Sequence, residues 1–183
     1  TRHRAQPHPH FPSRPFLSVP GATLLGMATW QEFSRQAPGF AERVRARFDA
    51  AASHVLATVR RDGSPRVSGS EVRYAGPHMY IGSMLDARKA QDLRRDRRFA
   101  LHAFPSAEGD AKVAGAVVEV TDQSEVDVVQ GDVQPCHLFR LDLTEAVMTE
   151  VEGNTLVITV WHPGAPPVRY ERPDNGPVVR IES

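Results

Sequence analysis

Six basic side chains stand close together in the segment DARKAQDLRRDRR at positions 86–98. They are Arg88, Lys89, Arg94, Arg95, Arg97 and Arg98. Arginine and lysine form charge-assisted hydrogen bonds with phosphate, and the free N–H groups at a helix start add to this attraction. The segment could bind a phosphorylated small molecule, bind nucleic acid, or form the solvated face of a helix. In the last case Asp86 and Asp92 would screen the bases.

Composition argues against nucleic acid as the partner. The chain has 22 Lys and Arg and 22 Asp and Glu, so its formal net charge is zero, whereas nucleic-acid-binding domains usually carry a basic excess. Few aromatic residues lie near the run to stack on bases. Within the run, Arg88 and Lys89 at the start of an expected helix are the candidates for a phosphate. The four later arginines are expected to be solvated or paired with Asp92 and Asp96.

Two segments rich in small residues precede the basic run. They are PRVSGSEVRY at 65–74, which begins near Arg66, and MYIGS at 79–83. Their small residues are Ser68, Gly69, Ser70, Gly82 and Ser83. A strand surface of small residues lets a flat ligand approach the backbone N–H and C=O groups closely. The sequence therefore predicts a ligand site where these strands meet the start of the basic helix.

The catalytic residues of the chain stay unassigned. His54 and His102 each stand alone on an expected apolar strand, where a hydrogen-bonded structural role is more usual. Cys136 and His137 are neighbours in an expected strand, so their side chains point to opposite faces and cannot form a dyad. No H-x-x-x-H or C-x-x-C spacing occurs, and no metal site is predicted.

The elements that position these groups are mostly strands. Apolar residues at helical spacing predict a helix from Pro38, and Ala87, Ala90 and Leu93 predict another for the basic run. Alternation predicts strands at 54–60, 65–74 and 79–83, joined as an antiparallel meander with RDGS as the first turn. Further strands are expected at 98–104, 111–120, 137–151, 155–161 and 178–181, with a short helix around 121–131 and a loop at 162–177. Because no β-α-β alternation occurs, this order predicts an antiparallel barrel with helices at its edges.

The length of 183 residues suits one domain, which we expect at 27–183. Segment 1–26 is rich in Pro, His and Arg without periodicity, so we expect a disordered or artefactual extension. A signal peptide fits poorly there, since Pro20 and Gly21 interrupt the short apolar stretch. No apolar run is long enough to span a bilayer, so no membrane association is expected. The single cysteine, Cys136, excludes an intrachain disulfide and fits a cytoplasmic location.

The segments HVLATVRRDGSPRVSGSEVRY, MYIGSMLDARKAQDLRRDRRFALHAF and GDAKVAGAVVEV resemble the pyridoxamine 5′-phosphate oxidase-like split β-barrel family. The likeness runs from about Phe40 to Trp161. It implies a mainly β fold with short helices (α+β), a six- to seven-stranded antiparallel split β-barrel. It also implies a homodimer that binds FMN, or in some branches the deazaflavin F420, in a groove at the subunit interface. The implied activity is a flavin-dependent oxidoreductase that transfers hydride to or from a small organic substrate.

The resemblance also implies which residues bind the cofactor. They are Arg66, Val67, Ser68, Ser70, Ile81, Gly82, Ser83, Arg88, Lys89 and Lys112. Those at 66–70 match the strand that lies along the flavin, and those at 81–83 match a short third-strand contact. Arg88 and Lys89 match the basic pair that holds the flavin phosphate. Lys112 falls where the oxidases place a polar side chain near the flavin.

Two departures from the family pattern concern the substrate. Glu71 stands where pyridoxamine phosphate oxidases have a lysine, and WHPGAPPVRYERP replaces their basic C-terminal motif. The substrate is therefore expected to differ from pyridoxamine phosphate. Two alternatives stay open: an F420-dependent reductase, in which the four later arginines would hold the longer anionic tail, and a non-catalytic flavin- or haem-binding protein.

Overall fold

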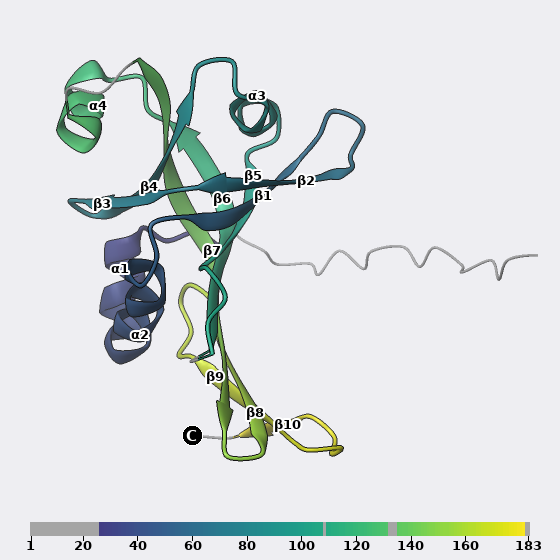
Figure 1. The fold of residues 1–183 in the computed structure, drawn as a ribbon. Coiled ribbons are helices and arrows are strands. Elements are labelled where there is room, and N and C mark those ends of the chain that lie inside the picture. The colour runs from purple at the N-terminus through teal and green to yellow at the C-terminus, as the bar shows by residue number, and fades with distance from the viewer. Residues whose placement is uncertain (1–25, 108, 132–134, 182–183) are drawn as a thin grey trace, which may run out of the picture.

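Strand β7 (Cys136–Glu152) runs through most of the molecule and joins its parts (Figure 1). The computed structural model describes residues 26–107, 109–131 and 135–181. The expected N-terminal extension at 1–26 lies outside the described residues, apart from Gly26. The helices are α1 (Trp30–Gln36), α2 (Pro38–Asp49), α3 (Arg88–Arg95) and α4 (Gln123–Gln130). The remaining strands are β1 (His54–Val59), β2 (Pro65–Ser70), β3 (Val72–Ala75), β4 (His78–Met84), β5 (Arg98–His102), β6 (Asp110–Glu119), β8 (Thr155–Trp161), β9 (Val168–Pro173) and β10 (Val179–Ile181).

The first seven strands form a split barrel. They follow the order β2-β1-β5-β6-β7-β4-β3, and each neighbouring pair is antiparallel. Strands β2 and β3 stand at the two ends of this order without pairing with each other, so the described sheet does not close. This arrangement confirms the mainly β fold with short helices and the split β-barrel that the resemblance implied.

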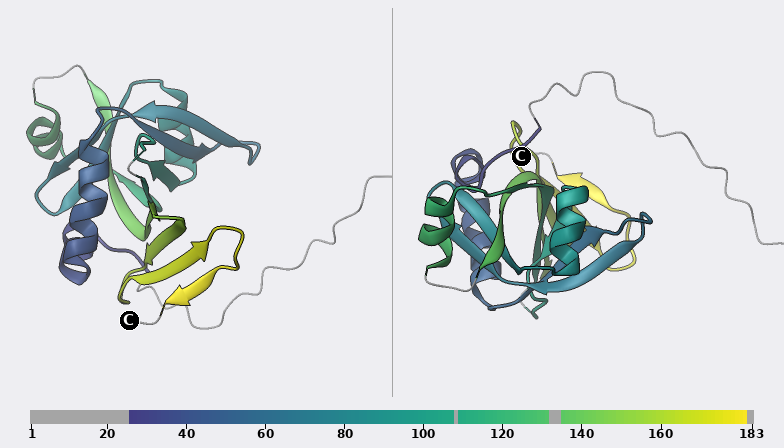
Figure 2. Two further views of the ribbon diagram at one scale, coloured as in Figure 1. Left: turned by 60° about the horizontal axis from the view of Figure 1, so that its bottom comes forward. Right: turned by 90° about the horizontal axis from the view of Figure 1, so that it is seen from above.

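Three strands extend the sheet beyond the barrel. The C-terminal part of β7 pairs with β8, which pairs with β9, and β9 pairs with β10 (Figure 2). The expected loop at 162–177 is therefore wrong, because β9 occupies its centre. The prolines at 163, 166 and 167 precede the stretch that pairs with β8, and Pro173 stands at its end.

The expected meander of three strands is also wrong. Segment 65–74 breaks at Glu71 into β2 and β3, which pair with different partners. The tight turn before it is as expected: the backbone N–H of Arg60 donates to Ser64 O at 2.8 Å, and Gly63 has a φ of 84°. The break carries the chain from one end of the barrel sheet to the other.

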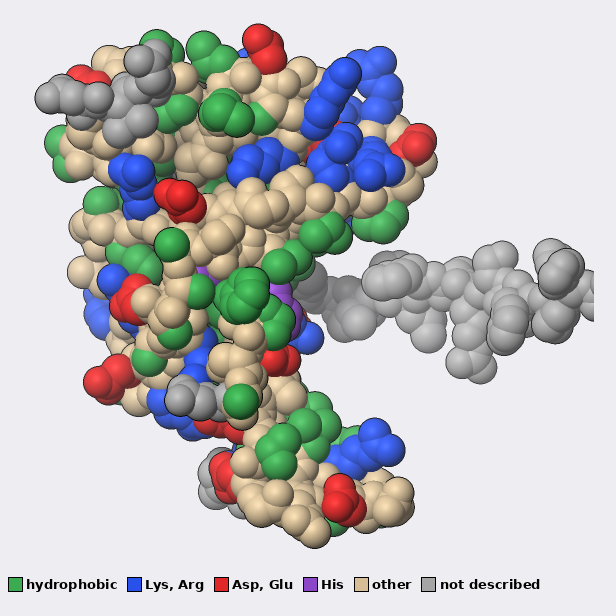
Figure 3. Space-filling view, viewed as in Figure 1, with side chains coloured by type: hydrophobic (Ala, Val, Ile, Leu, Met, Phe, Trp, Pro, Cys, Tyr) green, Lys and Arg blue, Asp and Glu red, His purple; other side chains and the backbone are tan. Residues whose placement is uncertain are grey.

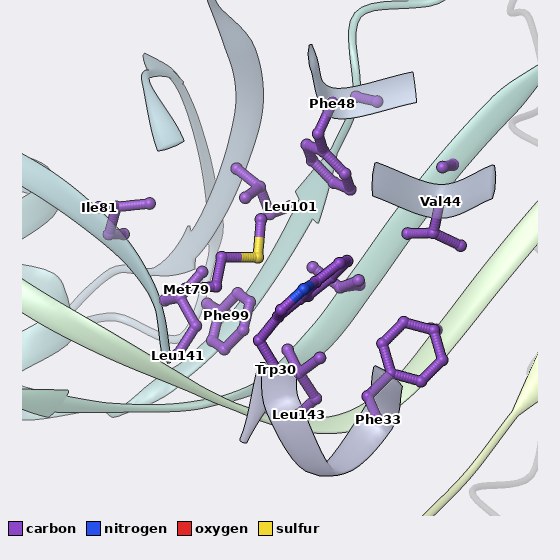
Figure 4. Packing of buried hydrophobic residues seen from close by; sticks show 14 of the residues in the cluster. Trp30, Phe33, Val44, Phe48, Met79, Ile81, Phe99, Leu101, Leu141 and Leu143 are labelled. Atoms are coloured by element: carbon purple, nitrogen blue, oxygen red, sulfur yellow. The ribbon is translucent and has the colours of Figure 1, made fainter. Parts of the chain in front are cut away.

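The core lies between the barrel and the two N-terminal helices. Figure 4 shows Phe48 and Val44 from α2 and Trp30 and Phe33 from α1, packed toward Met79, Leu101, Leu141 and Leu143 of the sheet. Trp161 of β8 is fully buried, and its ring centroid lies 4.3 Å from that of Phe33. Burial of these large apolar side chains stabilises the barrel, at ~2 kcal/mol for each one.

Helices α3 and α4 lie at the same end of the barrel, on opposite sides of β4 and β7 (Figures 1 and 2). Helix α4 caps a second small core of Tyr80, Val120, Val129 and Leu138. Among the described helices, none is long and apolar enough to cross a membrane.

Candidate functional site

Helix α3 packs on the barrel through the apolar stripe that the sequence predicts. Ala90 and Leu93 are buried, Ala87 is half-buried, and the helix contacts β1 and β4. Consecutive side chains of an α-helix point about 100° apart. Arg88 and Lys89, at the start of α3, therefore reach different sides of the helix, and each lines a separate hollow.

The first hollow, here called the serine hollow, has a volume of about 480 Å³. It is lined by Ser53, Gly69, Ser70, Glu71, Arg73, Gly82, Ser83, Met84, Ala87, Lys89, Gln130 and Cys136. Four of the predicted cofactor residues meet here, namely Ser70, Gly82, Ser83 and Lys89. The fold thus brings the small residues of β2 and β4 together with one base of the run, as the sequence predicts.

Lys89 forms one wall of the serine hollow. Its Nζ donates to the backbone carbonyl of Gly69 at 2.7 Å and lies 3.5 Å from Ser70 Oγ. Burial lowers the pKa of the Lys89 ammonium, and the nearby Glu71 carboxylate opposes that shift. The lysine is therefore held against the exposed edge of β2 beside the two small residues.

Two buried polar groups of this hollow lack partners. Within the part of the chain that the structure describes, Ser83 Oγ and Gln130 Nε2 make no hydrogen bond, although Ser83 is only 6% exposed and Gln130 8%. Gln130 was missed in the sequence, because a lone glutamine at a helix end carries no motif. Native proteins pair nearly all buried polar groups, so such orphans indicate a ligand or ordered water.

The second hollow, here called the arginine hollow, lies on the other side of α3. Its volume is about 790 Å³, and it is lined by Arg60, Arg61, Asp62, Arg66, Arg88, Gln91, Asp92 and Arg95. Figure 3 shows Lys and Arg side chains gathered over this corner of the molecule. Five arginines face two aspartates here, so the hollow favours an anion. It holds the predicted residues Arg66 and Arg88.

The buried carboxylate of Asp92 links three side chains at this corner. Asp92 accepts from Arg66 Nε at 2.6 Å, from Arg95 at 3.1 Å and from Thr58 Oγ1 at 3.1 Å. Burial opposes ionisation of Asp92, but these hydrogen bonds outweigh it and lower the pKa of the carboxyl. Asp92 thereby neutralises part of the arginine charge, which leaves Arg88 as a more available base at the helix start.

The later arginines are partly engaged as expected. Arg95 pairs with Asp92 and Arg98 with Asp96, whose pKa that bond lowers to about 2. Arg94 instead pairs with Glu119. The Nε of Arg97 donates to the backbone carbonyl of Val117 at 2.6 Å. Of these four arginines, only Arg95 lines the arginine hollow.

Four predicted cofactor residues lie outside both hollows. Val67 on β2 is 69% exposed, and Ser68 beside it is half-buried. Ile81 is buried in the core of the barrel. Lys112 is exposed on β6, where it pairs in register with His102 of β5 and Val147 of β7. The fold of one chain does not bring these four side chains to the hollows.

The two histidines that the sequence singled out have structural surroundings. His54 is buried against the ring of Phe48, and burial lowers its pKa. The Nδ1 of His102 lies 2.6 Å from the carbonyl oxygen of Ala103. Neither side chain lines the serine or the arginine hollow. In the described ranges, no group of three His, Cys, Asp or Glu side chains could hold a metal ion.

A sequence profile of the family described as pyridoxamine 5′-phosphate oxidase matches residues 40–149, which is more than half of the chain. No curated protein sequence matches the chain. The profile covers β1 to β6 and most of β7, including every residue that lines the two hollows.

Solved structures share the fold at low sequence identity. PhzG from Burkholderia lata, in complex with tetrahydrophenazine-1-carboxylic acid, is 14% identical, with 81% of this chain and 93% of that chain covered and a TM-score of 0.56. A pyridoxamine 5′-phosphate oxidase-related, FMN binding protein from Nostoc punctiforme is 15% identical, with 79% and 96% covered and a TM-score of 0.53. A heme binding protein from Mycobacterium smegmatis is 16% identical, with 66% and 57% covered and a TM-score of 0.53.

Proposed function

Since the chain belongs to the pyridoxamine 5′-phosphate oxidase family, we propose that it binds a flavin, FMN, at the start of α3 and is a flavin-dependent oxidoreductase acting on a small organic substrate. The observation that carries the proposal is the convergence in the serine hollow. Ser70 from β2, Gly82 and Ser83 from β4 and Lys89 from α3 come from separate parts of the sequence and line one hollow of about 480 Å³. The flavin-binding domain proposed is residues 27–183.

The residues around α3 fit a flavin phosphate. Arg88 is exposed at the first position of α3, and no side chain of Ala87 covers the free N–H groups of the first turn. Arg88 and Lys89 reach the start of α3 from its two sides and would hold a phosphate between them with charge-assisted hydrogen bonds, each contributing about 1.5–3 kcal/mol. Arg66 is fixed nearby by Asp92 and adds positive charge without having to be ordered on binding.

The small residues fit the flat ring of a flavin. Gly69 on β2 and Gly82 on β4 present backbone without a side chain, and Ser83 Oγ and Gln130 Nε2 are buried groups with no protein partner in the described structure. A bound flavin would supply hydride transfer through the N5 atom of its isoalloxazine ring. The task of the chain's own residues would be to orient the ring and to exclude water.

The charge of the serine hollow supports a substrate other than pyridoxamine phosphate. Glu71 lines the hollow, and its carboxylate would repel a second phosphate group. Arg73 also lines it, but its Nη1 donates to the carbonyls of Val129 and Gln130 at 3.1 and 3.2 Å. A second anionic group would therefore meet the Glu71 carboxylate, an arginine that is already engaged, and Lys89, which would already hold the flavin phosphate.

We also propose that two copies of the chain associate through the outer face of β1, β2, β5 and β6. In-register pairing puts Val55, Ala57, Val67, Ala100, Ala114 and Lys112 on this face. Val67 is 69% exposed and Val55 37%, and the small alanines make the face flat. Flat apolar surfaces of this kind are typical of subunit interfaces. Lys112 stands on the same face. A second copy packed on this face would bring Lys112 toward the flavin bound by that copy.

The arginine hollow favours F420 as an alternative cofactor. Arg60, Arg61 and Arg95 line it in addition to Arg88, which is more positive charge than a single phosphate requires. The longer anionic tail of F420 would use Arg60 and Arg61, because Arg95 is already paired with Asp92. Arg94, Arg97 and Arg98 are engaged elsewhere and would not take part.

The proposal is tested by titrating the purified protein with FMN, F420 and haem, and then assaying turnover under NAD(P)H, reduced F420 or oxygen. We expect saturable binding of FMN or F420 and a redox reaction that depends on it. Binding without turnover under any donor would instead support a carrier of the cofactor. A protein that binds none of the three would contradict the proposal.

A further inference from the structure

The α4 side of the serine hollow has a different chemistry from the α3 side. Gln130, the last residue of α4, and Ser83 of β4 line it, and both are more than nine-tenths buried. Neither Gln130 Nε2 nor Ser83 Oγ has a hydrogen-bond partner among the described residues. An amide nitrogen can only donate, and a hydroxyl can donate or accept. Together they can satisfy a group that accepts hydrogen bonds.

Gly82 leaves room for the Gln130 amide over β4. A Cβ atom on Gly82 would stand 2.7 Å from Gln130 Nε2, closer than such atoms approach. The glycine therefore leaves just enough room for the amide to lie over the backbone of β4. Arg73 holds the same end of α4 by donating to the carbonyls of Val129 and Gln130. The amide thus lies among these neighbours without a hydrogen bond to any described residue.

On this side of the serine hollow, the described cations already donate to protein groups. Lys89 Nζ donates to Gly69 O, Arg73 is engaged at the end of α4, and Glu71 contributes negative charge. Leaving a buried donor unpaired is unfavourable, so a ligand that accepts from it binds more tightly. Neutral donors beside a carboxylate favour an uncharged acceptor such as a carbonyl oxygen.

We propose that Gln130 and Ser83 recognise the carbonyl edge of an uncharged planar ring. This inference deepens the proposed function and rests on it for the source of the ring, which is either the pyrimidine edge of the flavin or a quinone- or lactam-type substrate. Gly82 is a positioning residue, because it acts only through the Gln130 amide.

Two phosphate-free probes separate these sources. Lumichrome carries the dicarbonyl ring of a flavin without the ribityl phosphate, and menadione is a neutral quinone. Dissociation constants for both are measured by fluorescence quenching with the wild type and the variants Gln130→Leu, Ser83→Ala and Gly82→Ala. Gln123→Leu is the matched control, since Gln123 is an exposed glutamine of α4 that bonds to Asp127 and lies outside the serine hollow.

We expect Gln130→Leu and Gly82→Ala to raise the dissociation constant of at least one probe about tenfold, and Ser83→Ala about threefold to fivefold. Gln123→Leu should leave both constants unchanged. If the variants weaken the binding of lumichrome alone, Gln130 and Ser83 recognise the flavin. If they weaken the binding of menadione alone, the two residues recognise the substrate. The urea midpoint of Gln130→Leu should be equal to or higher than that of the wild type, because an unpaired buried amide is replaced by an apolar group of similar size.

Other outcomes overturn the inference. They are a wild type that binds neither probe, or a Gln130→Leu protein that binds both probes normally and unfolds at lower urea. In the second case Gln130 would have only a structural role. A wild type that binds FMN but shows no dependence of either probe on Gln130 would leave the proposed function standing without this inference. A wild type that fails to bind FMN and F420, yet binds menadione through Gln130, would contradict the proposed function and support this inference.

Discussion

The Nε atom of Arg66 on β2 lies 2.6 Å from the carboxylate of Asp92 on α3, and this ion pair joins the two elements that border both hollows. The side chain of Asp92 is only 5% exposed and that of Arg66 24%. Arg95 and Thr58 complete the hydrogen bonds of the carboxylate. The position of α3 against β2 therefore depends on one buried charge that is fully paired.

Replacing Asp92 with Asn should destabilise the protein by about 1–3 kcal/mol, because the buried side chain loses its charge-assisted hydrogen bonds with Arg66 and Arg95. Urea unfolding measures this loss. Asp96→Asn is the matched control: its pair with the exposed Arg98 should contribute less than about 1 kcal/mol. Equal effects of the two substitutions would contradict the central role of Asp92.

The same carboxylate should make the protein sensitive to acid. The pKa of Asp92 is lowered from its ordinary value of 3.8, so its contribution is fully present above pH 3.8 and is lost as pH falls through the lowered pKa. We expect the stability of the wild type to decrease more steeply below pH 4 than that of Asp92→Asn. Parallel curves for the two proteins would count against this ion pair as the cause.

Alkaline conditions should weaken the attachment of α4. Burial, together with a hydrogen bond to Glu125 at 2.9 Å, raises the pKa of Tyr80 from 10.0 to about 12. A raised pKa means stability that is present below pH 10 and is lost as pH rises toward 12. Tyr80→Phe should cost about 1 kcal/mol at pH 7 but lose less stability between pH 10 and 12 than the wild type. Thermal unfolding followed across this range checks both expectations.

Replacing Arg88 and Lys89 together with Ala should weaken FMN binding by about 2–5 kcal/mol, as two charge-assisted hydrogen bonds are removed. The fold should be unchanged, since Arg88 is exposed and Lys89 bonds only to the edge of β2. Arg94→Ala is the control on the same helix, because Arg94 pairs with Glu119 away from the hollows. An FMN dissociation constant equal to that of the wild type would contradict the proposal that Arg88 and Lys89 bind the phosphate.

A charge on the outer face of β2 should separate the two copies. We expect Val67→Arg to run as a monomer in size-exclusion chromatography with light scattering, while the wild type runs as a dimer. Val128→Arg provides the same substitution at a still more exposed valine, 80% exposed on α4, and should remain dimeric. A wild type that is monomeric at micromolar concentration would contradict association through this face.

Much of this fold could be predicted from local patterns in the sequence. The stripe of Ala87, Ala90 and Leu93 predicts α3, because a helix period needs no tertiary information. Helix α1 was missed although Thr29 and Glu32 form a capping box, a signal that was available in the sequence. Strand β9 was not predictable in this way, because its strand geometry depends on pairing with β8 and β10.

The residues of the candidate site could be predicted from the sequence, but their separation into two hollows could not. Arg88 and Lys89 are adjacent in sequence and were expected to act together, yet the turn of the helix directs them into separate hollows. Asp92 was expected only to screen the bases, and its burial follows from the packing of α3 on β1 and β4. The position of Gln130 over Gly82 depends on how α4 lies against β4, which no local pattern encodes.

The most direct test of the central claim is a fluorescence titration of FMN with the purified wild-type protein. The proposed site around the start of α3 requires saturable quenching that ends at one FMN per chain. It also requires that the Arg88 and Lys89 double substitution shift the curve to higher protein concentration. FMN fluorescence that does not saturate, or a curve unchanged by the double substitution, would contradict a flavin site at this helix.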